Sequence, residues 1–133
     1  MDGNKAAFGA VGAALSYVFG SLDAMLVTLL IFIVIDFASG FIRAWVKKEF
    51  DSSKFYIGGV KKVGILAIVA IATQLDRIVL GDNIILRSVT ISYYIANEAF
   101  SVLENYGGLG LPLPKALKDA LKKLREDNDS DNK

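Results

Sequence analysis

The chain is built from long apolar segments separated by short polar ones. Four hydrophobic segments follow one another, at residues 6–20, 24–46, about 62–80 and about 84–106. Crossing ~30 Å of hydrocarbon takes about 20 helical residues. The last three segments reach that length, whereas the first is shorter and rich in Gly and Ala. We therefore predict an all-α, polytopic membrane protein with three long transmembrane helices and a short N-terminal hydrophobic helix.

The composition also favours a membrane over a water-soluble core. The 133 residues are 53% hydrophobic with a mean hydropathy of +0.45, and residues 24–35 and 63–75 carry no charge. A chain this short has too little polar surface to bury all three long hydrophobic segments. There is no Cys and no His, which removes disulfides, thiol nucleophiles and the commonest zinc ligands. These absences lead us to expect no enzyme and no metal or cofactor, and the net charge of only +1 leads us to expect no nucleic-acid partner.

Basic residues gather at two places and predict the orientation of the spans. Residues 43–62 hold six basic residues against two acidic ones, further lysines follow the last span, and the charges of residues 76–87 balance. Loops rich in Lys and Arg stay in the cytoplasm. The N-terminus then lies outside if residues 6–20 do not cross, and inside if they do. The predicted cytosolic anchors are Arg43, Lys47, Lys48, Lys54, Lys61, Lys62, Lys115, Lys118, Lys122 and Lys123.

The two loops between the long spans are expected to hold local structure. Residues 49–57 mix charges with aromatic side chains and suit a short interfacial helix, capped by Ser52 or Ser53. In the other loop we expect the charged residues to pair with one another: Asp76, Arg77, Asp82 and Arg87.

The region after the last span is predicted to be a separate cytosolic unit. Gly107 and Gly108 end a helix, and the Leu-Pro-Leu-Pro of residues 111–114 prevents its continuation and opens a new helix. We expect residues 1–110 to form a transmembrane helical domain. Residues 111–133 then form a cationic amphipathic helix, lying on an anionic leaflet or paired with another helix, and a polar tail. Its apolar face is predicted to contain Leu117, Leu121 and Leu124.

Polar residues interrupt the apolar segments at positions that share a helical face. Asp36 lies near the middle of its segment, where an ionised carboxylate costs roughly 2.5–3.5 kcal/mol unless it faces protein or water. Two interpretations stay open for such residues: interhelical hydrogen bonding, or the lining of a polar path. Glu104 is expected to form an interfacial ion pair instead, with Arg43, Lys47 or Lys48. Besides Asp36, the predicted polar stripe consists of Asn97, Glu98, Ser101, Glu104 and Asn105.

Small residues recur at a spacing of four in two segments. Small side chains let neighbouring helices approach closely. We therefore predict helix-packing surfaces at Gly12, Ser16 and Gly20 in the first segment, and at Gly40 and Ala44, which follow Asp36 in the second.

The order of these features resembles one protein family. The residues that carry the resemblance are Asp36-x-x-x-Gly40, Ser52-Ser53-Lys54, Gly58-Gly59-Val60-Lys61-Lys62, Leu75-Asp76 and the stretch YIANEAFSVLENYGGLGLPLPKAL. Together they cover roughly residues 25–125 and are similar to the bacteriophage lysis and toxin-secretion holins of Gram-positive hosts.

The resemblance implies a small protein in the host's cytoplasmic membrane that assembles into a homo-oligomeric ring or raft and opens large lesions. An endolysin, or in relatives a toxin, passes outwards without necessarily touching it, and an antiholin is a possible partner. We hypothesise that the polar stripe is satisfied between helices in a small assembly and lines water in a larger ring.

Three other functions remain open. A small ion channel or transporter subunit would use the stripe as a fixed narrow path. An antiholin-like regulator would share the fold and packing surfaces with a holin. A membrane scaffold would dock through its amphipathic helix and change no permeability.

Overall fold

The chain folds entirely into helices over the part described by its structure, a computed structural model of residues 2–81 and 83–131. These residues contain no strand, which confirms the all-α prediction. In chain order the helices are α1 (Asp2–Phe19), α2 (Ala24–Val46), α3 (Ser52–Val79), α4 (Ile85–Gly108) and α5 (Lys115–Asp131).

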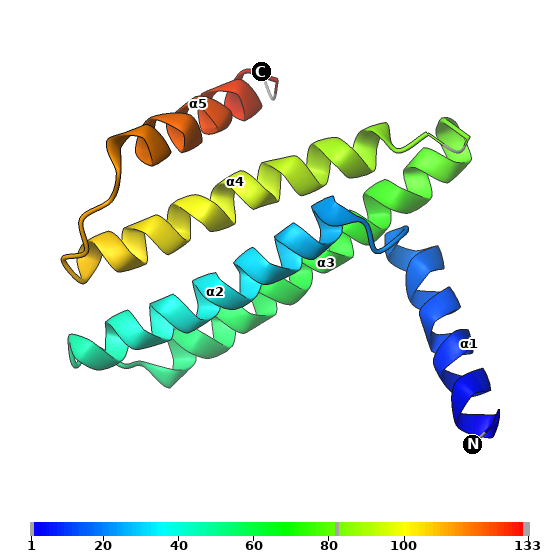
Figure 1. Ribbon diagram of the computed structural model, residues 1–133, viewed down its shortest axis with the longest axis horizontal. Helices are drawn as coiled ribbons and strands as arrows, with labels where there is room; N and C mark the ends of the chain where they lie inside the picture. The colour runs from blue at the N-terminus through cyan, green and yellow to red at the C-terminus, as the bar shows by residue number, and fades with distance from the viewer. Residues whose placement is uncertain (1, 82, 132–133) are drawn as a thin grey trace.

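Helices α2, α3 and α4 form the body of the molecule (Figure 1). They run alternately up and down, and α4 lies against both α2 and α3. Buried side chains from all three helices make a common apolar core: Leu26, Leu29, Ile65, Val69 and Ile91. The first helix projects away from this bundle, and α5 returns along α4. The bundle is therefore the part of the molecule that can position a shared site.

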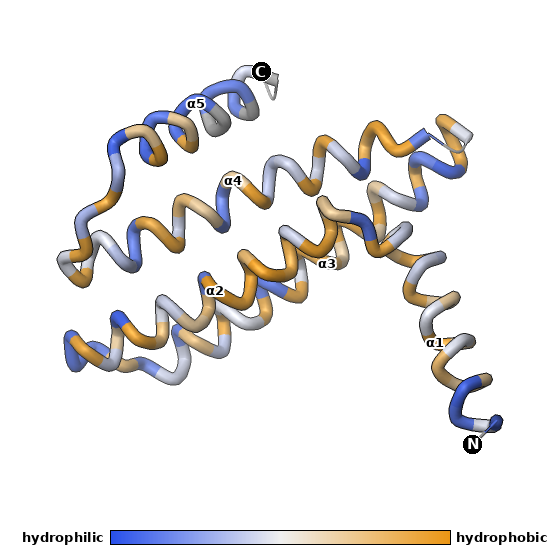
Figure 2. Tube along the Cα trace, in the orientation of Figure 1, coloured by the Kyte–Doolittle hydropathy of each residue, from blue (hydrophilic) through white to orange (hydrophobic). Residues whose placement is uncertain are grey.

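Two helices of the described chain, α2 and α3, are long and apolar enough to cross a membrane. Figure 2 shows α2 as almost continuously hydrophobic. The prediction of three apolar spans is met only by these two, because α4 carries Arg87, Glu98 and Glu104 among several uncharged polar residues. Its length matches a span, but its composition alone does not.

The third helix begins well before the predicted residue 62. Asp51 caps it, with its Oδ1 accepting hydrogen bonds from the backbone N–H groups of Ser53 at 2.9 Å and Lys54 at 3.4 Å. The predicted cap at Ser52 or Ser53 is therefore wrong, as is the separate interfacial helix at residues 49–57. One continuous helix therefore runs through this region. Lys54, Lys61 and Lys62 belong to this helix, not to a loop.

The end of the chain is more helical than expected. Helix α4 ends at Gly108 as predicted, and α5 starts directly after Pro114. However, α5 continues to Asp131, so most of the predicted polar tail is helix. The side chain of Leu124 and residues 132–133 lie outside the described part of the chain.

Helix α1 contacts the bundle through its C-terminal turn, and none of its described residues is buried. Gly12 and Ser16 line an apolar pocket of about 310 Å³ between α1 and the bundle. A Cβ on Gly12 would meet no atom within 4 Å, so the predicted packing surface is not in contact here. Gly20 has another role, because its φ of +81° ends the helix in a left-handed conformation.

Candidate functional site

Each helix of the bundle contributes one charged side chain to a network in its interior. Asp36 of α2 and Glu98 of α4 are both 6% exposed. The Nζ of Lys62, from α3, donates hydrogen bonds to the Oδ2 of Asp36 and, at 2.6 Å, to the Oε2 of Glu98. One ammonium group thus joins three helices through two carboxylates.

Amide and hydroxyl groups complete this network. The Nδ2 of Asn105 lies 3.2 Å from the Oδ1 of Asp36 and 3.0 Å from the Oγ of Ser39, and donates to both. Ser39 is fully buried and donates to the backbone carbonyl of Asp36 at 3.1 Å. A Cβ on Gly40 would lie 3.5 Å from the Asn105 amide, an ordinary van der Waals distance, so the predicted packing position at Gly40 faces α4. Among the described residues, no buried side-chain nitrogen or oxygen lacks a hydrogen bond.

The charges of the network do not cancel. Two ionised carboxylates and one ammonium carry a formal charge of −1, which one bound proton would neutralise. Burying these charged side chains costs free energy unless each charge is paired and hydrogen-bonded. In this network each of the three charged side chains is both. Loss of one partner would leave like or unpaired charges inside the bundle.

An open pocket of about 220 Å³ reaches this network from the end of the bundle where α2 joins α3. Its lining residues are Asp36, Phe37, Gly40, Lys54, Phe55, Gly58, Lys62, Ser101 and Asn105. Water can therefore approach the charged groups from this side while the network stays closed between the helices.

The structure brings together only part of the predicted polar stripe. Glu98, Ser101 and Asn105 share the face of α4 that looks towards Asp36. Asn97 is half-buried, and its side chain forms no hydrogen bond with any described residue. The stripe is narrower than predicted because residues 97 and 104 are rotated away from the face that includes residues 98, 101 and 105.

Glu104 does not form the expected ion pair with Arg43, Lys47 or Lys48, all of which are described. It is exposed, and Arg43 instead donates from Nη1 to its backbone carbonyl at 3.3 Å. The Arg43 guanidinium packs against Gly108, because a Cβ on that glycine would lie 2.6 Å from the Cζ of Arg43. A cation thus meets the carbonyl end of α4, where the helix dipole favours positive charge.

Lys62 was predicted as a cytosolic anchor, and that prediction is wrong. Its placement followed from assigning residues 43–62 to a loop, whereas the longer α3 carries it into the bundle. Ser39, three residues after Asp36, was not predicted to belong to the site. A sequence signal for Lys62 existed, since Asp36 and Glu98 needed a cation and Lys62 directly precedes an apolar run. Of the remaining predicted anchors, Arg43 is half-buried and the others are exposed: Lys47, Lys48, Lys54, Lys61, Lys115, Lys118, Lys122 and Lys123.

Aromatic side chains form a cluster that includes Phe37 and Phe55 of the pocket lining. Ring centroids lie 5.1–6.5 Å apart in a chain of contacts that we call the aromatic cluster. It lies beside the exposed lysines at the junction of α2 and α3, a combination typical of a membrane interface. Its members are Phe37, Phe41, Trp45, Phe50 and Phe55.

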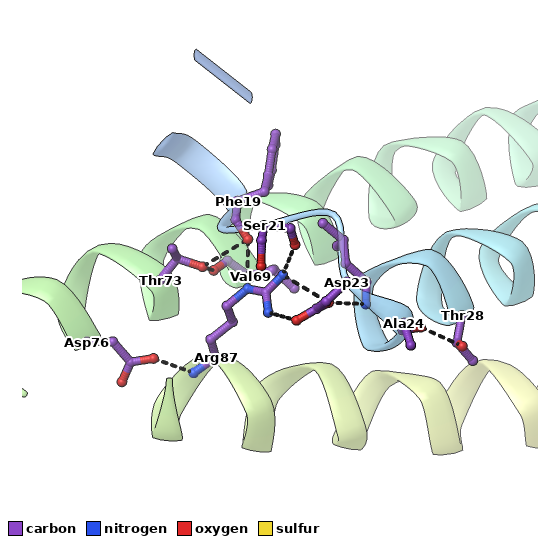
Figure 3. A network of polar contacts seen from close by, with 10 residues as sticks. Phe19, Ser21, Asp23, Ala24, Thr28, Val69, Thr73, Asp76 and Arg87 are labelled. Carbon is purple, nitrogen blue, oxygen red and sulfur yellow. Dashed lines mark hydrogen bonds and ion pairs between the residues drawn. The ribbon is translucent and has the colours of Figure 1, made fainter. Parts of the chain in front are cut away.

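A second network closes the opposite end of the bundle (Figure 3). Arg87 of α4 is 1% exposed, and its Nη1 lies 2.7 Å from the Oδ2 of Asp23. Its Nε and Nη2 donate at 2.8 Å to the backbone carbonyls of Phe19 and Ser21. Asp23 also caps α2 by accepting from the backbone N–H of Leu26 at 3.0 Å. The hydrogen bond from Arg87 lowers the pKa of Asp23 below its ordinary value of 3.8.

Among the described charged residues at the α3–α4 connection, Asp76, Arg77 and Arg87 do not form the predicted ion pairs with one another. Asp76 uses its carboxylate to accept the backbone N–H groups of Leu86 and Arg87, each at 2.9 Å, and so caps α4 from the neighbouring helix. Arg77 donates to the backbone carbonyl of Tyr17 and lies over the Tyr17 ring, 4.3 Å from its centroid. Asp82 lies outside the described residues. Through Arg77 and Arg87, this end of the bundle therefore holds the last turn of α1.

The sequence is similar to one protein family and to several individual proteins. The sequence model of the bacteriophage holin family matches residues 13–126. A protein named "Probable holin" from Bacillus phage phi105 is 34% identical over 122 residues, which cover 92% of this chain and 89% of that protein. An uncharacterized 14.9 kDa protein of Clostridium perfringens is 39% identical over 114 residues, covering 86% of both chains. No solved structure matches the chain.

Proposed function

The chain belongs to the bacteriophage holin family, and on that premise we propose that it permeabilises the cytoplasmic membrane of a bacterial host. Copies of the chain assemble in the membrane and open lesions wide enough for an endolysin, or in relatives a toxin, to pass. The endolysin needs no direct contact with the chain.

In this proposal α2, α3 and α4 all cross the membrane. The polar residues of α4 do not prevent this, because Glu98 and Asn105 are paired inside the bundle and Arg87 is paired at its end. The basic residues and the aromatic cluster at the α2–α3 junction support a cytoplasmic location for that end. The C-terminus follows α4 on the same side and is cytoplasmic.

The observation that carries the proposal is the Asp36–Lys62–Glu98 network. In one copy it is satisfied between three helices, and an open pocket reaches it. If the helices separate and the same face turns towards a lumen, water satisfies these groups instead. Two states of similar free energy suit a protein that stays harmless until it opens.

A lesion that passes a folded enzyme requires many copies, so we propose a ring or raft held by contacts between bundles. The exposed apolar sides of α2 and α3 supply surface for such contacts and for lipid. An antiholin of the same fold could enter the assembly and delay opening.

The test is expression of the full chain in a bacterium, with and without an endolysin that lacks a secretion signal. Optical density, membrane potential and release of a cytosolic enzyme are followed together. Abrupt lysis only when both proteins are present supports the proposal. Loss of potential without enzyme release would replace it with a small-pore channel or an antiholin-type regulator, and unchanged permeability would indicate a scaffold.

A further inference from the structure

Helix α5 contacts the bundle over a small area. Among its described side chains only Leu121 is half-buried, and Leu117 is 44% exposed. Between α5 and the bundle remains an apolar cavity of about 190 Å³. Its lining residues are Phe32, Ile35, Ala99, Val102, Leu103, Leu117 and Leu121. Because native interiors are close-packed, an open cavity at this contact indicates that α5 is only loosely packed against the bundle.

The helix is attached at one end by a short connection. The backbone N–H groups of residues 109–111 still bond to the last turn of α4, and Gly110 has a φ of +88°. Leu113 lies close to Gly107, where a Cβ would be 3.7 Å from its Cδ1. The prolines at positions 112 and 114 prevent a continuous helix through this connection. Residues 111–114 can therefore act as a joint between α4 and α5.

The position of α5 places its charged face at the wrong depth for a membrane. The helix runs back along α4 (Figure 1). Leu117 and Leu121 line the same cavity as Phe32 and Ile35, which belong to the middle of α2. Lys115, Lys118 and Lys122 follow the i, i+3, i+7 spacing on the opposite face, and all are exposed. In a bilayer spanned by α2 this face would point into hydrocarbon, where lysines are strongly disfavoured. Figure 2 shows the contrast between the mostly hydrophilic α5 and the hydrophobic α2.

We infer that α5 leaves its position against α4 when the bundle inserts into a membrane. Lipid acyl chains then fill the cavity, and the lysine face of α5 binds the anionic phospholipid headgroups of the cytoplasmic leaflet. This inference rests on the proposed membrane function. On the leaflet Leu117 and Leu121 enter the acyl boundary, and the lysines reach the phosphates beside them. The joint at residues 111–114 permits this movement without unfolding α4.

The test uses the full chain, which contains no Cys, with spin labels at Val102→Cys and Leu121→Cys on opposite walls of the cavity. The distance between the labels is measured in amphipol and in vesicles of equal parts phosphatidylcholine and phosphatidylglycerol. We expect the distance to lengthen in the vesicles and the Leu121 label to lie at headgroup depth. An unchanged distance between the two labels would overturn the inference that α5 leaves the bundle. A lengthened distance with the label in bulk water would overturn the headgroup contact.

Two controls separate this inference from the proposed function. A variant with Lys115, Lys118, Lys122 and Lys123 changed to Gln is expected to lose the headgroup position while keeping the lengthened distance; a retained headgroup position would overturn the role of the lysines. A third label, at Ile68→Cys on the exposed side of α3, reports insertion. If that label lies in water, the membrane placement and the inference fall together. If it lies in hydrocarbon while the distance between the labels at positions 102 and 121 is unchanged, only the movement of α5 away from the bundle is overturned.

Discussion

The ammonium group of Lys62 lies 2.6 Å from the Oε2 of Glu98, although these residues are 36 positions apart. The same Nζ also donates to Asp36. Lys62 is therefore the cation on which two buried carboxylates depend. Changes at this one residue should affect the bundle more than changes at any of the exposed lysines around it.

Lys62→Met should strongly destabilise the bundle. Removing one partner of a buried ion pair typically costs roughly 3–5 kcal/mol, because the other charges stay buried without compensation. The free energy of unfolding in mixed micelles, followed by far-ultraviolet circular dichroism, measures the loss. Lys61→Met is the matched control, since Lys61 is exposed, and it should change stability by about 0.5 kcal/mol or less. Equal effects of the two substitutions would contradict a structural role for the network.

Glu98→Leu should delay lysis or abolish it at equal expression. The variant keeps a neutral Asp36–Lys62 pair inside the closed bundle, and it removes a charge that water would satisfy in an open assembly. The onset of lysis in the endolysin co-expression assay is the measurement. Glu104→Leu, on the exposed side of the same helix, should leave the onset near that of the unmodified chain. An unaltered onset for Glu98→Leu would remove this residue from the proposed switch.

Asp23→Asn should destabilise the chain at neutral pH but not at acidic pH. Asn caps a helix as well as Asp does, so the substitution isolates the interaction with Arg87. Its loss should cost roughly 1.5–3 kcal/mol, the usual range for hydrogen bonds to charged groups. The pKa of Asp23 is lowered in the folded state, so its carboxylate contributes stability above the ordinary value of 3.8, and this contribution is lost as the pH falls through the lowered pKa. Unfolding of both chains across pH 2 to 7 tests the prediction, and a difference that does not shrink in acid would contradict it.

Gly20→Ala should destabilise the junction between α1 and the bundle. A Cβ there would lie 2.5 Å from the Nε of Arg87, and the φ of +81° costs a non-glycine residue roughly 1–2 kcal/mol. Gly12→Ala, inside α1, is the control, because its Cβ would meet no atom within 4 Å. That change should stabilise α1 by about 0.5–1 kcal/mol. Thermal unfolding of the two variants should therefore shift in opposite directions.

Features set by neighbouring residues could be predicted from the sequence. The hydrophobic segments gave helices, and the glycines and prolines of residues 107–114 marked the end of α4 and the start of α5. The alignment of Glu98, Ser101 and Asn105 followed from helical spacing alone. The same spacing placed Asp36 and Gly40 on one face of α2.

Features set by distant residues could not be predicted in the same way. The location of Lys62 depended on the cap at Asp51 and on carboxylates from two other helices. Arg87 pairs with Asp23 across 64 residues, so the nearer acid at Asp76 was a reasonable but wrong partner. A rule that assigns basic residues to loops has no means of recognising a cation that an interior requires.

The aromatic cluster contains the single tryptophan of the chain, Trp45, which is 68% exposed and stacks at 6.1 Å on Phe41. Indole fluorescence shifts with the polarity around the ring, so the unmodified protein carries one intrinsic probe at one defined level. Its emission maximum, and quenching by brominated lipids, can follow the arrival of the basic end at a bilayer surface in real time. The order of insertion, assembly and opening thus becomes measurable without any added dye.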